Sequence, residues 1–246
     1  MPRLQIKYVL IFVILVAFRT KGVTQSLSVD STASSGVKNA LALYNQSLTD
    51  QLHLYNGREY KDYVQAFEVG QPYFLQPAWS TGTINYDGNT YKDVSMLYNV
   101  ITDEVIIRNY NAVSKIQLQK QKIKSFSFLG HSFFNILKDS LLTSNLDPGF
   151  YDVLATGGIT LLAKRTKNMQ TDIRQKVEYK IYSKDHFYLK KDNTYIPIRT
   201  KKTFLEQLGD KKKEMQKYMR QNKFRFRADK ENVMTKVVKY YNQLTK

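Results

Sequence analysis

Short turn-forming dipeptides interrupt the middle of this chain, and they constrain its fold more than any other feature. Asn56-Gly57 and Asp87-Gly88 are each flanked by Tyr and β-branched residues, and Thr156-Gly-Gly158 separates two further apolar runs. Asn-Gly and Asp-Gly favour a type I′ turn, because both central residues of that turn need a positive φ. Residues 50–200 are therefore predicted to form antiparallel strands joined by hairpins.

The runs between these turns have the composition of strands. In the run Ile123-Lys-Ser-Phe-Ser-Phe128, apolar residues stand two apart, which is the spacing of a half-buried strand. Asp147-Pro-Gly149 predicts a further turn. The other predicted strands are residues 91–99, 105–110, 115–118, 132–137, 151–154, 159–163, 186–190 and 195–198.

Helical periodicity flanks this strand region on both sides. Apolar residues from Val37 to Leu48 predict the one helix expected in the first half of the chain. Near the C-terminus, one helix is predicted to end at Gly209, a second to be capped by Asp210 and a third by Asp229. The sequence thus predicts an α+β fold, in which an antiparallel β-rich sheet or partial barrel carries one N-terminal helix and two to three C-terminal helices.

The N-terminus has the composition of an export signal. Arg3 and Lys7 precede an apolar run of eleven residues from Tyr8 to Phe18. As a helix this run rises about 16 Å, which is short of the roughly 30 Å of bilayer hydrocarbon. Residues 1–25 are therefore predicted to be a secretory signal peptide, with an uncleaved anchor as the alternative. Cleavage would leave a periplasmic or secreted protein.

The remaining chain is long enough for one domain. Residues 26–36 are rich in Ser and Thr and are predicted to be a flexible lead-in. Residues 37–246 suffice for one sizeable core, so a single β-rich domain that ends in a basic helical tail from about residue 200 is expected. A change in charge near residue 160 leaves two domains as the alternative.

Positive charge is concentrated at the C-terminal end. The chain has 38 Lys and Arg against 21 Asp and Glu, a formal net charge of +17. Residues 161–246 hold 24 of these basic and 9 of these acidic residues, whereas residues 26–160 carry a net charge of −2. The candidate anion-binding residues are Lys211, Lys212, Lys213, Arg225 and Arg227.

The anionic partner that this basic region is expected to bind depends on the compartment in which the protein is predicted to reside. Anionic lipid headgroups, lipopolysaccharide or acidic glycans are envelope components, whereas binding to nucleic acid would require the export prediction to be wrong. A solvated basic surface without a specific partner is the alternative.

Aromatic residues make up 13% of the chain, and many Tyr residues stand close together in its first half. A sheet face that exposes aromatic rings can stack against sugars, which makes Trp79, Tyr86 and Tyr91 candidate sugar-stacking residues. The alternative is that Tyr, a good strand former, fills the core and its rim.

Signatures of catalysis and metal binding are missing. Cysteine is absent, which excludes disulfides and thiolate chemistry. His53, His131 and His186 lie far apart in the sequence, without the spacing of a zinc motif. No catalytic, cofactor or metal site is predicted, and the protein is expected to be non-enzymatic.

Two segments repeat the same pattern at an offset of 31 residues. Tyr55-Asn-Gly-Arg-Glu-Tyr-Lys-Asp62 and Tyr86-Asp-Gly-Asn-Thr-Tyr-Lys-Asp93 match at five of eight positions. Either a hairpin was duplicated or the same turn chemistry was used twice.

The run from Leu54-Tyr-Asn-Gly-Arg-Glu-Tyr60 through Gly70-Gln-Pro-Tyr-Phe74 and Gly82-Thr-Ile-Asn-Tyr-Asp-Gly-Asn-Thr-Tyr91 resembles a family of exported proteins from Bacteroidetes-type bacteria. The C-termini of that family are similar to Lys201-Lys-Thr-Phe-Leu205 and Tyr240-Tyr-Asn-Gln-Leu244. The resemblance covers most of residues 40–246. It implies an envelope or secreted location and no particular chemistry.

These features favour a non-enzymatic envelope binding or interaction protein whose basic C-terminal region faces an anionic partner. The alternative is a carbohydrate-binding or carbohydrate-active protein that uses the Tyr- and Trp-rich hairpins as its binding surface.

Overall fold

A computed structural model of the chain describes Gly36 and residues 53–109, 113–137, 146–174, 176–192 and 194–245, with only the backbone of Asp210. The predicted signal peptide, the predicted lead-in apart from Gly36, and the predicted helix from Val37 to Leu48 lie outside the described residues. The chain divides into two compact units, Met1–Leu48 and Thr49–Lys246, and all the strands and helices given below belong to the second.

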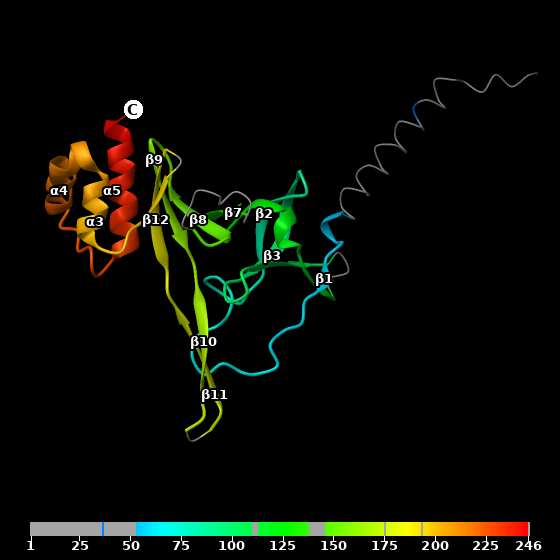
Figure 1. The fold of residues 1–246 in the computed structure, drawn as a ribbon. Coiled ribbons are helices and arrows are strands. Elements are labelled where there is room, and N and C mark those ends of the chain that lie inside the picture. Colours follow the sequence, from blue (N-terminus) through cyan, green and yellow to red (C-terminus); the bar gives the residue numbers. More distant parts are fainter. Residues whose placement is uncertain are drawn as a thin grey trace, which may run out of the picture. The chain divides into compact units, whose positions relative to one another are not determined.

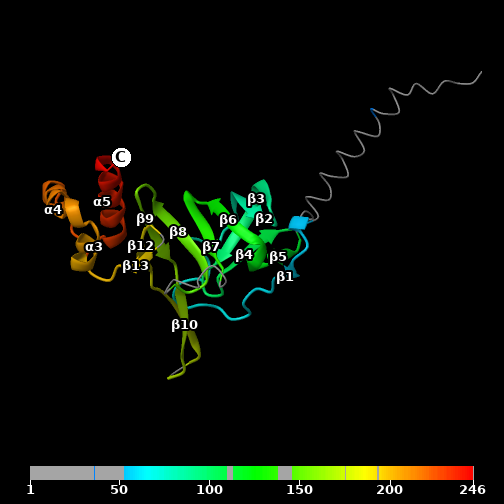
Figure 2. The ribbon, with the colours of Figure 1, turned by 45° about the horizontal axis from the view of Figure 1, so that its top comes forward.

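Eleven strands form one antiparallel sheet (Figures 1 and 2), in the order β1-β5-β4-β3-β2-β6-β7-β8-β9-β12-β13. The edge strands β1 and β13 each pair with one neighbour, so the described sheet is open. The predicted β-rich α+β class is therefore confirmed. The strands of this sheet are β1 (Arg58–Glu59), β2 (Ser80–Tyr86), β3 (Asn89–Asn99), β4 (Glu104–Arg108), β5 (Lys115–Gln117), β6 (Ile123–Phe128), β7 (His131–Ile136), β8 (Gly149–Ala155), β9 (Ile159–Lys164), β12 (His186–Lys191) and β13 (Thr194–Pro197). A 3-10 turn, η1 (Lys120–Lys122), precedes β6.

A separate two-stranded ribbon continues from β9 and β12. Its strands β10 (Lys167–Asp172) and β11 (Glu178–Ser183) pair antiparallel with each other. In Figures 1 and 2 this ribbon extends away from the helices and from the sheet. We call residues 167–183 the arm.

The predicted turns are only partly confirmed. Asp87 and Gly88 have φ values of 52° and 85° and join β2 to β3, as a type I′ turn requires. The hairpin predicted at Asn56-Gly57 is wrong, because residues 53–54 are helical and β1 pairs with β5 instead. Gly57 is needed for a different reason, since a Cβ at this position would overlap the carbonyl oxygen of Gln117. The repeated motif therefore adopts two different conformations.

Three α-helices follow the sheet, as predicted: α3 (Lys201–Gln207), α4 (Lys212–Gln221) and α5 (Lys230–Leu244). The prediction that Asp210 caps α4 is wrong, because residues 209–211 form a 3-10 turn, η3 (Gly209–Lys211), and Lys211 is the N-cap. Asp229 is the N-cap of α5, although no side-chain capping bond is formed there. None of the helices in the described part of the chain is both long and apolar enough to cross a bilayer.

Two large hydrophobic cores hold the fold together. The first, which we call the helical core, lies between the three helices and strands β8, β9 and β12; Leu161, Phe204 and Val237 are fully buried in it. The second is aromatic, and the rings of Phe126 and Phe133 stack at its centre with centroids 4.8 Å apart. Each fully buried side chain of this kind stabilises the fold by roughly 1.5–3 kcal/mol.

Candidate functional site

Helix α4 separates its apolar side chains from its basic ones. Met215 and Met219 are buried in the helical core. Lys213, Lys217 and Arg220 are exposed on the other side. Because these cations are spaced by four and three residues, they form one row along the helix.

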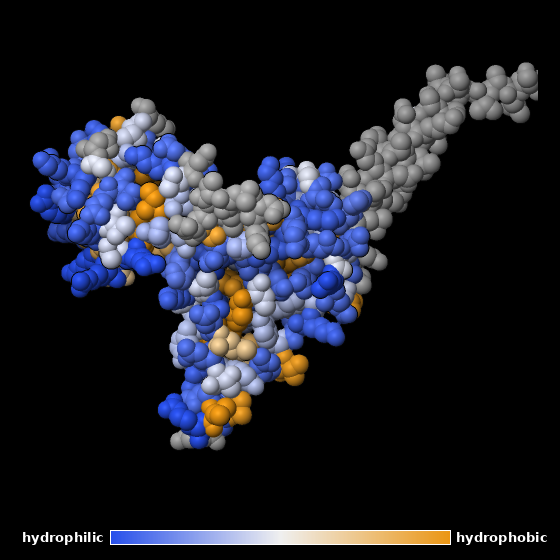
Figure 3. Space-filling model, in the orientation of Figure 1, coloured by the Kyte–Doolittle hydropathy of each residue, from blue (hydrophilic) through white to orange (hydrophobic). Residues whose placement is uncertain are grey.

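The connection from α4 to α5 continues this basic character. Phe224 and Phe226 pack against the helical core, and the intervening Arg225 and the following Arg227 are exposed. Lys223 is exposed as well. In Figure 3 mostly hydrophilic side chains surround α4. We define the basic surface as Lys213, Lys217, Arg220, Lys223, Arg225 and Arg227.

Few negative charges neutralise this surface. Residues 199–245 contain fourteen Lys and Arg against five Asp and Glu, a net charge of +9. None of the six cations of the basic surface forms an ion pair with another described side chain, whereas Lys211 Nζ lies 3.6 Å from Glu214 Oε2. The cationic groups of the basic surface are therefore available to a ligand.

The structure sorts the five predicted anion-binding residues into two groups. Lys213, Arg225 and Arg227 are exposed, whereas Lys211 and Lys212 are half-buried. Lys217 and Arg220 were not among the residues predicted from the sequence. Their spacing from Lys213 along a predicted helix is the signal that would have found them.

The predicted sugar-stacking residues do not share one surface. Tyr86 is only 1% exposed, because it belongs to the aromatic core, and Tyr91 is half-buried against the same core. Trp79 packs against Leu97 and Ile106, which point to the opposite face of the sheet. The three rings therefore cannot stack together on one sugar.

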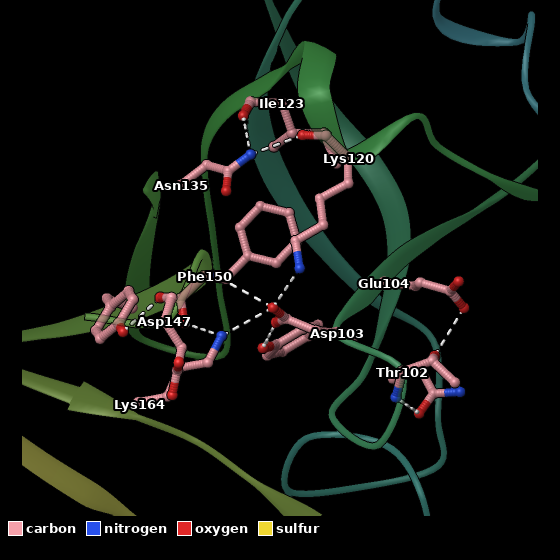
Figure 4. A network of polar contacts seen from close by, with 12 residues as sticks. Thr102, Asp103, Glu104, Lys120, Ile123, Asn135, Asp147, Phe150 and Lys164 are labelled. Atoms are coloured by element: carbon pink, nitrogen blue, oxygen red, sulfur yellow. Dashed lines mark hydrogen bonds and ion pairs between the residues drawn. The ribbon is translucent and has the colours of Figure 1, made fainter. Parts of the chain in front are cut away.

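A polar network joins the turn between β3 and β4 to the rest of the sheet (Figure 4). Asp103 Oδ2 accepts hydrogen bonds from Lys120 Nζ at 2.6 Å and from Lys164 Nζ at 2.8 Å. Its other carboxylate oxygen accepts from the hydroxyl of Tyr98 at 2.5 Å. A side chain at Gly149, whose φ is +140°, would overlap both Asp103 and Lys164.

Opposite charges decide the ionisation of this network. Burial by itself would raise the pKa of Asp103, but the ammonium groups of Lys164 and Lys120 outweigh burial and lower it. Burial lowers the pKa of Lys164, although Asp103 opposes that shift. One carboxylate and two ammonium groups leave a net charge of +1, but each of the three charged groups has a hydrogen-bond partner inside the network. We therefore assign the network a structural role.

A second ionic cluster surrounds Arg165, at the root of the arm. The side chain of Arg165 donates from Nη2 to Asp152 Oδ2 at 2.5 Å, and from Nη1 to Asp185 at 2.7 Å and to Glu231 at 2.5 Å. Asp152 is fully buried, and its Oδ2 also lies 2.8 Å from His131 Nδ1. The cluster therefore fastens α5, through Glu231, to the sheet and to the base of the arm.

A hollow of about 430 Å³ lies beside this cluster and is lined in part by Phe74, His131 and Arg165. Asp152 orients His131 as a carboxylate orients a general base. No hydroxyl or thiol among the described side chains is hydrogen-bonded to His131, and three carboxylates occupy the guanidinium of Arg165. The described residues also contain no group of three His, Cys, Asp or Glu side chains placed to hold a metal ion.

Comparisons of the chain with protein-family models, with curated proteins and with solved structures find no match. The resemblance to exported bacterial proteins stays a prediction from the motifs. The charge and geometry of the described residues are therefore the basis for a functional proposal, and the basic surface contains six exposed cations without an ion-pair partner among them.

Proposed function

We propose that the protein is an exported, non-enzymatic binding module that holds an anionic partner on its basic surface. One observation carries the proposal: Lys213, Lys217 and Arg220 form an exposed row on α4 without an ion-pair partner among the described side chains. Export is the part of the proposal that depends on the N-terminal sequence.

The position of the row favours binding to an extended surface. The row lies on the outside of a helix whose opposite side is anchored by Met215 and Met219. A cation close to an anionic membrane surface contributes about 1 kcal/mol, so three cations together contribute about 3 kcal/mol, or roughly 100-fold in affinity. A row of this kind fits a sheet of anionic groups better than it fits one small ion.

The chemistry of the partner is that of closely spaced phosphate, sulfate or carboxylate groups. Arginine supports this interpretation, because its planar guanidinium binds such groups with two parallel hydrogen bonds. Lipid headgroups, lipopolysaccharide and acidic glycans all carry these groups in the envelope. Among them we favour anionic lipid headgroups, since a row of cations on a helix can contact many headgroups at once.

Co-sedimentation with vesicles tests the proposal. The protein is expected to bind phosphatidylglycerol vesicles but not phosphatidylcholine vesicles, and binding should weaken as salt is raised above about 0.15 M, because salt screens the charges. The variant Lys213→Glu/Lys217→Glu/Arg220→Glu should lose this binding. Retention on heparin without vesicle binding would instead indicate an acidic glycan, and an unchanged affinity of the variant would refute the basic surface as the site.

A further inference from the structure

Exposed apolar side chains gather on the arm and on the adjacent segment, residues 64–69. Among the described residues ten large apolar side chains are exposed, and six of them lie here. The segment hydrogen-bonds to the arm, because Ile181 donates its backbone N–H to Val69 O at 2.8 Å. Figure 3 shows orange, hydrophobic side chains along the arm. The six residues are Val64, Val69, Met169, Ile173, Val177 and Tyr182. An apolar concentration of this kind marks an interaction surface.

One edge of the arm is covered and the other is open. Strand β11 pairs with β10 on one side and forms a bridge with Val69 on the other. No other strand in the described part of the chain pairs with the outer edge of β10. Natural edge strands often carry proline or a free lysine, which prevents pairing with another chain. Strand β10 contains no proline, and its one lysine, Lys167, donates from Nζ to the carbonyl oxygens of Gln71 and Tyr73.

The hydrogen-bond pattern shows which residues of β10 face outward. Lys184 donates its N–H to Thr166 O at 2.8 Å, and hydrogen-bonding positions alternate along an antiparallel pair. The backbone groups of Lys167, Met169 and Thr171 therefore point away from β11. Met169 is the central residue of these three and is 40% exposed, and its Sδ lies 3.7 Å from Nε2 of Gln65 in the adjacent segment.

We propose that two copies of the protein associate by pairing their β10 strands antiparallel across this edge. With Met169 opposite the partner subunit's Met169, the outward-facing Lys167 lies opposite Thr171 of the partner subunit. Asn168 then lies opposite Gln170 of the partner subunit, so two amides face each other. This register brings no like charges together and places the apolar residue at the two-fold axis.

The charge of the arm also favours a second copy as its partner. The arm carries four Lys and Arg against two Asp and Glu, a net charge of +2, whereas residues 199–245 carry +9. Most charges of the arm are paired within it, as between Arg174 Nη2 and Asp172 Oδ2 at 2.7 Å and between Lys180 Nζ and Glu178 Oε2 at 2.6 Å. Two copies of this basic protein therefore meet where their mutual repulsion is small.

Because the chain contains no cysteine, single-cysteine variants test this register directly. Residues opposite each other at a hydrogen-bonded position have Cα atoms about 5.5 Å apart, within the range of a disulfide. Met169→Cys is therefore expected to form a disulfide-linked dimer under mild oxidation. Thr171→Cys is the matched control, because each Thr171 would lie about 13 Å from its counterpart along the strands.

The full-length parent protein should also have the mass of a dimer in light scattering at high concentration. A monomeric parent, or equal cross-linking of Met169→Cys and Thr171→Cys, would overturn the proposal. The inference is independent of the proposed function. The variant with three charge reversals on α4 should dimerise as the parent does, so each proposal is able to fail without the other.

Discussion

Asn242 of α5 forms two hydrogen bonds with the backbone of Ile159 at the start of β9. Its Oδ1 accepts from the N–H of Ile159 at 3.0 Å, and its Nδ2 donates to the carbonyl oxygen of Ile159 at 2.8 Å. The turn that precedes β9 leaves room for this contact only because residue 157 is glycine, since a Cβ there would overlap the amide of Asn242. The helices that carry the basic surface are thereby fixed to the sheet at one end of α5.

Replacing this amide should destabilise the fold. Asn242→Ala leaves the N–H and carbonyl groups of Ile159 buried without a partner, which costs roughly 1–3 kcal/mol for each unsatisfied group. We expect a lower free energy of unfolding in urea titrations. Gln243→Ala, at an exposed neighbouring position, is the control and should leave the unfolding curve unchanged. Equal effects of the two substitutions would show that the hydrogen bonds to Ile159 contribute nothing.

Replacing Arg165 should destabilise the fold more than replacing Asn242. Arg165→Met keeps most of the side-chain volume but leaves the buried carboxylate of Asp152 without its guanidinium partner, at a cost of about 3–5 kcal/mol. Arg174→Met removes an ion pair whose arginine side chain is 86% exposed. That control should hardly change the thermal unfolding midpoint, because exposed pairs contribute little. Similar midpoints for both variants would contradict the role assigned to Arg165.

Gly149 should tolerate no side chain. Alanine at this position would displace Asp103 or Lys164 from their ion pair, in addition to its strained backbone. Gly88→Ala is the matched control, because Gly88 also has a positive φ, of 85°, but has open space around it. Chemical denaturation should therefore show a clearly larger loss of stability for Gly149→Ala than for Gly88→Ala. If the two losses of stability are equal, the positive φ alone explains why glycine is required at position 149.

Asp103 should make the free energy of unfolding depend on pH in the acidic range. Because its pKa is lower in the folded protein than in the unfolded chain, near 3.9, the unfolded state binds more protons in the window between the two values. The contribution of Asp103 is thus fully present above about pH 5, falls as the pH drops through 3.9, and is lost below the folded pKa.

Asp103→Asn should flatten the rise in unfolding free energy that the parent shows from acidic pH up to about pH 5. Arg174 lowers the pKa of Asp172 to about 2 and adds a slope of the same sign. This slope is common to both proteins and cancels when they are compared. An identical slope for the parent and for Asp103→Asn would exclude the predicted ionisation of Asp103.

Local turn chemistry and periodicity were sufficient to predict most of the sheet. Residues 123–128 form β6 with the predicted bounds, because alternating apolar side chains coincide with a buried face. The strands of the arm were missed. In Lys167–Asp172 the residues are mostly polar and exposed, so neither face carries the apolar period that marks a strand.

The candidate sites were less predictable, because they depend on contacts between distant parts of the chain. His131 and Asp152 are adjacent only through the pairing of β7 with β8, and Glu231 joins Arg165 from 66 positions away. Tyr86 was expected at a surface, but the pairing of β2 with both β3 and β6 buries it. Only the basic row on α4 follows from local spacing.

We propose that the position of the cations on α4, and not net charge alone, determines binding to an anionic surface. A pair of variants with the same net charge tests this most directly. One variant is Lys213→Glu/Lys217→Glu/Arg220→Glu. The other is Lys61→Glu/Lys92→Glu/Lys124→Glu, which reverses three exposed lysines that form no ion pair with a described side chain. The measurement is the affinity of each variant for phosphatidylglycerol vesicles at about 0.15 M salt. We predict a loss of at least about 100-fold for the α4 variant and only a few-fold loss for the other. Equal losses would contradict the account, because they would show that net charge alone attracts the anionic surface.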